Sequence, residues 1–83
     1  MEIKDRVRQF ITENFYVADA SKLTDEASLL DQGIIDSTGV LELVGFLEGE
    51  YGIQLADEEI VAENLDSIAN IVGLVGRKKA GAA

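Results

Sequence analysis

The chain has 83 residues, the size of one small domain, and neither cysteine nor histidine, which excludes disulfides, thiolate metal ligands and histidine-based catalysis. The net charge is −9, and residues 23–76 hold twelve acidic side chains and no basic one, which excludes nucleic acid as a ligand and favours partners with basic surfaces. An apolar content of 47% with few aromatic residues and no proline favours an all-α fold, and no apolar run is long enough to span a bilayer.

Residues 2–16 predict the first helix, because apolar residues recur at helical spacing and charged residues occupy the other face. The next segment, residues 17–36, has no sustained period and is rich in turn-forming residues. It predicts a long loop with one short helical turn near Asp25–Leu30. Its apolar residues predict that the loop is held against the core: Leu23, Leu29, Leu30, Ile34 and Ile35.

Residues 37–51 predict the second helix. At 100° per residue, its core face consists of Val40, Leu43, Val44, Leu47 and Tyr51. The outward face carries Thr38, Glu42, Gly45 and Gly49, with Leu41 and Glu48 beside it. Glycine also occupies position 39, and glycines weaken a helix. They indicate either a flat face that a partner can approach closely or a marginal helix held by tertiary packing.

Gly52 is expected to end the second helix in the left-handed conformation. Asp57–Ala62 predicts a short third helix with acidic residues in its first turn, and Asn64 or Asp66 is expected to cap a fourth. The inward stripe of the fourth helix consists of Ile68, Ile71, Val72 and Val75. Residues 1–76 form the expected domain, and residues 77–83 form a basic tail that is expected to fray. The expected fold is an all-α four-helix bundle with three main helices, a short third helix and a long first loop.

Ser37 follows Asp36 at the predicted junction between the long loop and the second helix. The first N–H groups of a helix have no partner within the helix, and together with the helix dipole they tolerate a phosphate. Ser37 could therefore cap the helix or carry a phosphodiester. Taken alone, the junction favours the cap.

The surrounding sequence resembles the phosphopantetheine attachment region of the acyl carrier and peptidyl carrier protein family. The resemblance starts with a glycine, two apolar residues and an Asp-Ser pair at residues 33–37. A helix with the run Leu-Glu-Leu-Val follows at residues 41–44, and it ends in acidic residues before Tyr51-Gly52-Ile53. Acidic residues then recur at 57–59. The resemblance covers about residues 2–76.

This resemblance implies that Ser37 Oγ bears 4′-phosphopantetheine, which a phosphopantetheinyl transferase donates from coenzyme A. It implies that Asp36 helps the transferase to recognise the site. Partner enzymes would read the face of the second helix through basic patches, using Leu41, Glu42 and Glu48. Three positions depart from the common family pattern and fit a free-standing carrier of a specialised pathway: Thr38, Gly39 and Gly45.

The function expected from the resemblance is to carry thioester-bound acyl groups between partner enzymes, with no catalysis by the chain itself. The expected partners are the transferase, a loading ligase or acyltransferase, and downstream acyl-processing enzymes. We expect a cytoplasmic monomer that does not insert into membranes. An aminoacyl or peptidyl carrier of a nonribosomal-type pathway is one alternative, and an unmodified acidic helical interaction module is another.

Two further classes fit the sequence poorly. A calcium-binding loop from Asp31 to Glu42 would place Gly33, Ile35 and Asp36 at positions that require oxygen ligands or glycine. An enzyme would need a paired acid and nucleophile, and no such pair is evident. We therefore expect neither a metal site nor a catalytic residue.

Overall fold

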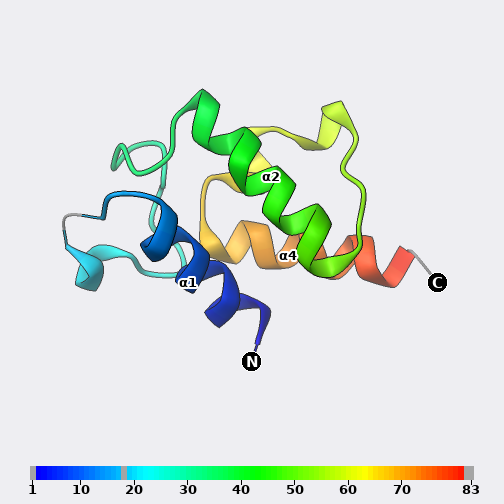
Figure 1. The fold of residues 1–83 in the computed structure, drawn as a ribbon, viewed down its shortest axis with the longest axis horizontal. Helices are drawn as coiled ribbons and strands as arrows, with labels where there is room; N and C mark the ends of the chain where they lie inside the picture. The colour runs from blue at the N-terminus through cyan, green and yellow to red at the C-terminus, as the bar shows by residue number, and fades with distance from the viewer. Residues whose placement is uncertain (1, 18, 82–83) are drawn as a thin grey trace.

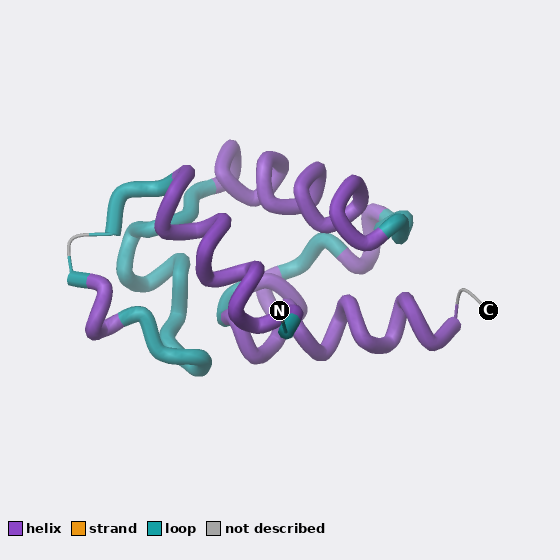
Figure 2. Tube along the Cα trace, turned by 60° about the horizontal axis from the view of Figure 1, so that its bottom comes forward, coloured by secondary structure: helices purple, strands orange, loops and turns teal. Residues whose placement is uncertain are grey.

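The computed structural model describes residues 2–17 and 19–81, and this part of the chain is helical without strands. Its helices are α1 (Ile3–Asn14), α2 (Ser37–Tyr51), α3 (Ala62–Leu65) and α4 (Ile68–Gly81), with 3₁₀ helices η1 (Ala20–Lys22) and η2 (Asp57–Glu59). The predicted all-α class, with three main helices and a long first loop, is confirmed. Figures 1 and 2 show α2 and α4 running in the same general direction and α1 running the opposite way. Within the described residues, every helix is too short or too polar to cross a membrane.

The core lies between the three main helices and the first loop. Its fully buried side chains come from all four segments: Val7, Ile11, Leu29, Leu43, Leu47, Ile68, Ile71, Leu74 and Val75. The predicted core face of α2 is confirmed, although Val40 and Tyr51 at its ends are only partly buried. The predicted stripe of α4 omitted Leu74, which is 1% exposed, while Val72 is only partly buried.

The end of α1 differs from the prediction, and the end of α2 confirms it. In each case the backbone conformation of one residue is the reason. The first helix was predicted to reach residue 16, but α1 ends at Asn14 because Phe15 takes an extended conformation, with φ −126° and ψ 154°. At the end of α2, Gly52 adopts the predicted left-handed conformation with φ 63°, which an L side chain would find strained. The helix α2 therefore ends at Tyr51, as predicted from the sequence.

The first loop is held against the core by apolar side chains, as predicted. Leu23, Leu29, Ile34 and Ile35 are buried, but Leu30, which was also predicted to hold the loop against the core, is 42% exposed and lies outside the core. This anchoring fixes the residues that lead into α2.

The short helical turn predicted at Asp25–Leu30 is wrong, because the helical turn of this loop is η1. Asp25 and Leu29 use their backbone groups in contacts with the other end of the chain. Asp25 O accepts a hydrogen bond from Ala69 N at 2.8 Å, and Leu29 N donates to Asp66 O at 2.6 Å. These long-range bonds take the place of the hydrogen bond from Leu29 N to Asp25 O that a helical turn over these residues would make.

The third helix is also corrected. One helix was predicted over Asp57–Ala62, but the chain forms η2 and then α3, with Ile60 and Val61 between them. Ile60 N donates to Asp57 O at 3.1 Å, the tight spacing of a 3₁₀ turn, and the Ile60 side chain packs against the core. The backbone leaves the helical conformation at Ile60, with ψ 69°, and is extended at Val61, with ψ 158°, so η2 and α3 do not join into one helix.

The cap of α4 is Ser67, not Asn64 or Asp66 as predicted. Ser67 Oγ accepts a hydrogen bond from Asn70 N at 3.1 Å, and Ser67 is 6% exposed. The other two side chains bond elsewhere, Asp66 to the first loop and Asn64 to the carbonyl of Glu59. Ser67 was missed because its role depends on where the chain turns after α3.

The predicted tail differs as well, since α4 continues without a break through residue 81. Lys78 Nζ lies 2.8 Å from Glu59 Oε1, and Arg77 Nη2 donates to Asn64 Oδ1 at 3.2 Å. These contacts connect Arg77 and Lys78 to the segment between α2 and α4. Residues 82–83 of the predicted tail lie outside the described residues.

Asp66→Ala is expected to lower the free energy of unfolding by about 1.5–3 kcal/mol, the usual range for hydrogen bonds to a charged group. Asp66 Oδ1 accepts hydrogen bonds from Ser28 Oγ at 2.8 Å and from Leu30 N at 3.0 Å. Removing the carboxylate leaves both donors without this partner. Urea unfolding followed by circular dichroism measures the loss. Glu63→Ala removes an exposed carboxylate from α3 and is the control, with an expected change within about 0.5 kcal/mol. Equal losses in both variants would contradict the assigned role of Asp66.

Candidate functional site

The start of α2 is capped by Asp36 and not by Ser37. Asp36 Oδ1 accepts a hydrogen bond from Gly39 N at 2.7 Å, and Asp36 O accepts one from Val40 N at 2.9 Å. Ser37 is the first residue inside the helix. The local interpretation of Ser37 as an N-cap is therefore wrong, because Asp36 provides the cap and the Ser37 hydroxyl is not used for it.

Ser37 differs from the other serines of the chain in both exposure and bonding. Ser21 Oγ donates to Asp19 at 2.6 Å, and Ser28 Oγ donates to Asp66 at 2.8 Å. Ser67 is buried at the start of α4, where it serves as the cap. Ser37 is exposed, and within the described residues its hydroxyl makes no hydrogen bond. It is the serine whose oxygen is both accessible and uncommitted.

Of the six remaining predicted site residues, Asp36 precedes Ser37 as the cap of α2, and the others follow Ser37 along the helix. All but one of the six are exposed: Asp36, Thr38, Leu41, Glu42 and Gly45. Leu41 is 66% exposed, a large apolar side chain directed away from the core. Positions Gly45 and Gly49 are open, because an added Cβ would meet nothing within 4 Å. This openness favours the interpretation of a flat outward face over that of a helix held by packing at those positions.

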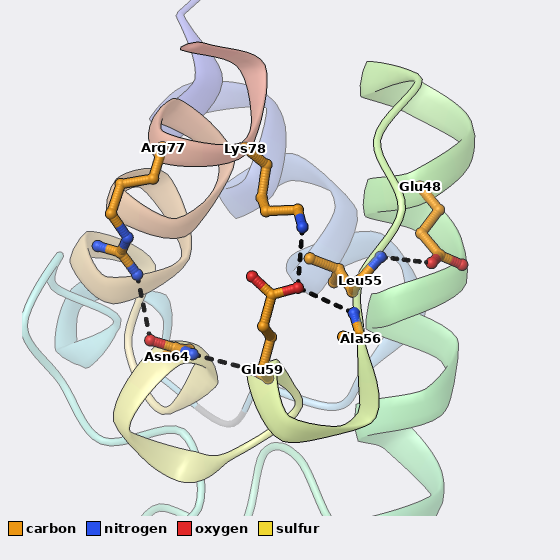
Figure 3. Close-up of polar contacts among 7 residues, drawn as sticks. All are labelled: Glu48, Leu55, Ala56, Glu59, Asn64, Arg77 and Lys78. Carbon is orange, nitrogen blue, oxygen red and sulfur yellow. Dashed lines mark hydrogen bonds and ion pairs between the residues drawn. The ribbon is translucent and has the colours of Figure 1, made fainter. Parts of the chain in front are cut away.

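Glu48 is placed differently from the other predicted residues, because it is half-buried and turned toward the segment after α2. Its Oε2 accepts a hydrogen bond from Leu55 N at 2.9 Å (Figure 3). The carboxylate thus holds the returning chain against α2. Only part of its surface remains open to a partner.

Glu59 forms a second tether, which was not predicted from the sequence. Its Oε1 accepts hydrogen bonds from Lys78 Nζ at 2.8 Å and from Ala56 N at 2.9 Å, and its carbonyl accepts one from Asn64 Nδ2 at 2.9 Å (Figure 3). The hydrogen bond from Lys78, with a further one from Ala56, holds the pKa of Glu59 below its ordinary value. This cluster fixes η2 and α3 beside α4.

Six of the seven basic side chains lie on α1 and α4, where they contact other groups of the same chain, and the seventh, Lys22, lies on η1. Lys4 and Arg8 pair with Asp25, and Arg6 pairs with Glu50 at 3.4 Å. On the exposed face of α2, in contrast, Asp36 and Glu42 form no ion pair with any described residue. The face around Ser37 therefore presents uncompensated negative charge, which favours partners with basic surfaces.

Gly39 is a site residue whose role the sequence did not reveal. It is buried, and a Cβ built there would lie 2.9 Å from Phe15 Cε1, closer than side chains pack. The residue thus allows the end of α1 to approach the first turn of α2. The sequence marked Gly39 as a departure from a family pattern and as one of three glycines that weaken the helix, and the contact with Phe15 supplies a physical reason for a glycine there.

The start of α2 fits a phosphate ester on Ser37. The backbone N–H groups of Ser37 and Thr38 bond to no other described group, and α2 has 15 residues, so its dipole favours negative charge at this end. The Asp36 carboxylate works against a second negative charge, but it accepts the Gly39 N–H and is turned toward the helix. Orphan N–H groups and an accessible hydroxyl meet the requirements of a covalently attached phosphate.

The chain matches the family model described as "Phosphopantetheine attachment site" over residues 5–75, a span from the first turn of α1 to the middle of α4. No curated protein matches the chain significantly. Domains of this family bear covalently attached 4′-phosphopantetheine, which implies a phosphopantetheinyl transferase and acyl-processing enzymes as partners. They generally serve as carriers and not as catalysts. With nearly the whole bundle matched, the chain belongs to the phosphopantetheine attachment family and is a phosphopantetheine-bearing carrier protein.

Proposed function

We propose that this protein is an acyl carrier protein whose 4′-phosphopantetheine is attached to Ser37. The observation that carries the assignment is the state of the Ser37 hydroxyl, which is exposed at the start of α2 and bonded to no described group. The serines at 21, 28 and 67 are each engaged in a hydrogen bond. Asp36, by capping the helix, keeps the neighbouring hydroxyl available.

Attachment requires one substitution at phosphorus. A bond forms between Ser37 Oγ and the phosphorus that bears the pantetheine arm in coenzyme A. The bond from that phosphorus to adenosine 3′,5′-bisphosphate breaks, the bisphosphate leaves, and the Ser37 proton passes to a base on the transferase. The chain contributes a nucleophile on a rigid helix end, and the helix dipole favours the phosphate charge that results.

When bound, the group supplies a thiol on a flexible arm, and a thiol carries acyl groups as thioesters. The chain has no cysteine to do this itself. Its own contribution is position, because a single anchored arm raises the effective concentration of cargo at each partner. The negative, open face of α2 around Leu41 and Glu42 supports docking of partners with basic surfaces.

The proposed cargo is an acyl group of a specialised pathway, loaded by a dedicated ligase or acyltransferase. Thr38 and Gly45 depart from the common family pattern and are exposed. They support the proposal that this carrier has its own dedicated partner enzymes. We further propose a cytoplasmic monomer, since coenzyme A is the donor and the chain's own helices close the core. Mass spectrometry of the arm on protein purified from its native host tests the cargo. An acyl mass supports the proposal, whereas an amino acid or peptide mass would assign the protein to nonribosomal-type synthesis.

Attachment itself is tested by co-expression with a broad-specificity phosphopantetheinyl transferase followed by intact-mass analysis. We expect the mass of the wild type to rise by one 4′-phosphopantetheinyl group. A known carrier protein, treated in parallel, shows that the transferase is active. Unmodified protein beside a fully modified control would overturn the proposal and would favour an unmodified acidic interaction module.

A further inference from the structure

We propose that Gly39 and Phe15 together position Ser37 for modification, so that Gly39 is a positioning residue for the transfer of phosphopantetheine. This inference rests on the proposed role of Ser37. Gly39 lies two residues after Ser37, in the same first turn of α2. The contact with Phe15 fixes the first turn of α2 relative to α1. The position of that turn then sets the direction of the Ser37 hydroxyl.

The approach at Gly39 is the closest that any described glycine of α2 makes to another part of the chain. A Cβ at Gly39 would lie 2.9 Å from Phe15 Cε1 and 3.4 Å from both Asp36 Oδ1 and Ile35 Cγ2. The same residue donates the hydrogen bond that caps the helix, from Gly39 N to Asp36 Oδ1 at 2.7 Å. Gly39 therefore connects the cap of α2, the end of the first loop and the end of α1.

The Phe15 ring is partly buried and packs against another aromatic ring, which restricts its movement away from an added methyl group. The Phe15 and Phe10 rings make an edge-to-face contact with centroids 5.9 Å apart, and Phe10 stacks on Phe46 at 4.1 Å. The backbone of Phe15 is held too, since its N–H donates to Ile11 O at 2.9 Å. An added methyl group would consequently displace the first turn of α2 more readily than the ring.

The test is the rate at which a broad-specificity transferase modifies Gly39→Ala. Restoring ordinary contact requires about 0.5 Å of movement, and misplacing a reacting group by about 1 Å can cost roughly a hundredfold in rate. We therefore expect kcat to fall about tenfold, with KM for the carrier changed less than twofold. A merely destabilised carrier behaves differently, because a smaller folded fraction lowers the effective substrate concentration and raises the apparent KM without lowering kcat.

Gly76→Ala is the matched control. It makes the same change inside α4, away from the face of α2 that partners approach, and an added Cβ there meets nothing within 4 Å. Alanine is the better helix former, so this variant should unfold at a higher temperature than the wild type and keep the wild-type kcat. Gly39→Ala should gain no such stability, although its local change in helix propensity is the same.

Rescue distinguishes positioning from damage to the fold. Phe15→Leu shortens the side chain that the methyl group would meet, so the double variant Phe15→Leu, Gly39→Ala should recover most of the lost kcat. All rates are compared at a temperature at which circular dichroism shows each variant to be folded. If Gly39→Ala alone does not fold, Phe15→Trp, which presses on the same turn while keeping Gly39, should show the fall in kcat.

Three outcomes would overturn the inference. The first is a wild-type kcat in folded Gly39→Ala, or in Phe15→Trp where that variant stands in for it. The second is a loss that the double variant does not restore, and the third is a loss confined to KM. Failure of the proposed function itself looks different, because the wild type would then remain unmodified beside a modified control carrier.

Discussion

Ser37→Ala is expected to carry no phosphopantetheine after treatment that fully modifies the wild type. The substitution removes the oxygen that must bond to phosphorus, and the neighbouring Thr38 does not replace it because its oxygen lies at a different position on the helix. The expected loss is complete within the detection limit of intact-mass analysis. Tandem mass spectrometry of the modified wild type should place the added group on the peptide that contains Ser37.

The same variant separates the anchor role of Ser37 from the role of a helix cap. Since Asp36 provides the cap, Ser37→Ala should change the free energy of unfolding by no more than about 0.5 kcal/mol. Asp36→Ala should cost about 1 kcal/mol, the usual effect of losing a capping side chain. Ser21→Ala is the control for modification, because Ser21 is exposed but bonded to Asp19, and it should be modified like the wild type. Full modification of Ser37→Ala would refute Ser37 as the anchor.

Leu47→Ala is expected to lower the free energy of unfolding by about 2–5 kcal/mol. Leu47 is 0% exposed and lies in the core cluster with residues of α1, α4 and the first loop. A domain of this size has a total stability of only about 4–12 kcal/mol, so the variant loses a large part of it. Urea unfolding followed by circular dichroism measures the change.

Leu41→Ala provides the matched control on the same helix. The chemical change is identical, but Leu41 is 66% exposed, so the expected effect is within about 0.5 kcal/mol. The comparison isolates burial from helix propensity, because both substitutions replace leucine by alanine inside α2. Similar losses in the two variants would mean that the faces of α2 are assigned incorrectly.

Hydrophobic periodicity predicted the main helices well. The stripes of α1 and α2 needed only local information, because residues three and four apart share a face of any helix. Gly52 was also predictable, since a left-handed residue at a helix end favours glycine in any fold. The end of α1 was predicted less well, because Phe15 leaves the helix to contact Gly39, a residue far away in the sequence.

Capping residues were predicted poorly for the same reason. Asp36, Asp66 and Ser67 all have side chains that can cap a helix, and the sequence does not say which of them will face a free N–H group. The structure uses Asp66 to bind the first loop through Ser28, and this leaves the cap of α4 to Ser67. Only the path of the chain between α3 and α4 decides between these roles.

By itself, the sequence determined the helical class, the acidic and base-free middle of the chain, and the Asp36-Ser37 junction within a family pattern. These features depend on residue type and spacing, which are local properties. The tertiary structure decided that Asp36 caps α2, that the Ser37 hydroxyl is consequently free, and that Gly39 lies against Phe15. Each of these depends on which groups meet in space. A hydroxyl is available for reaction only when no neighbouring group in the folded chain is hydrogen-bonded to it.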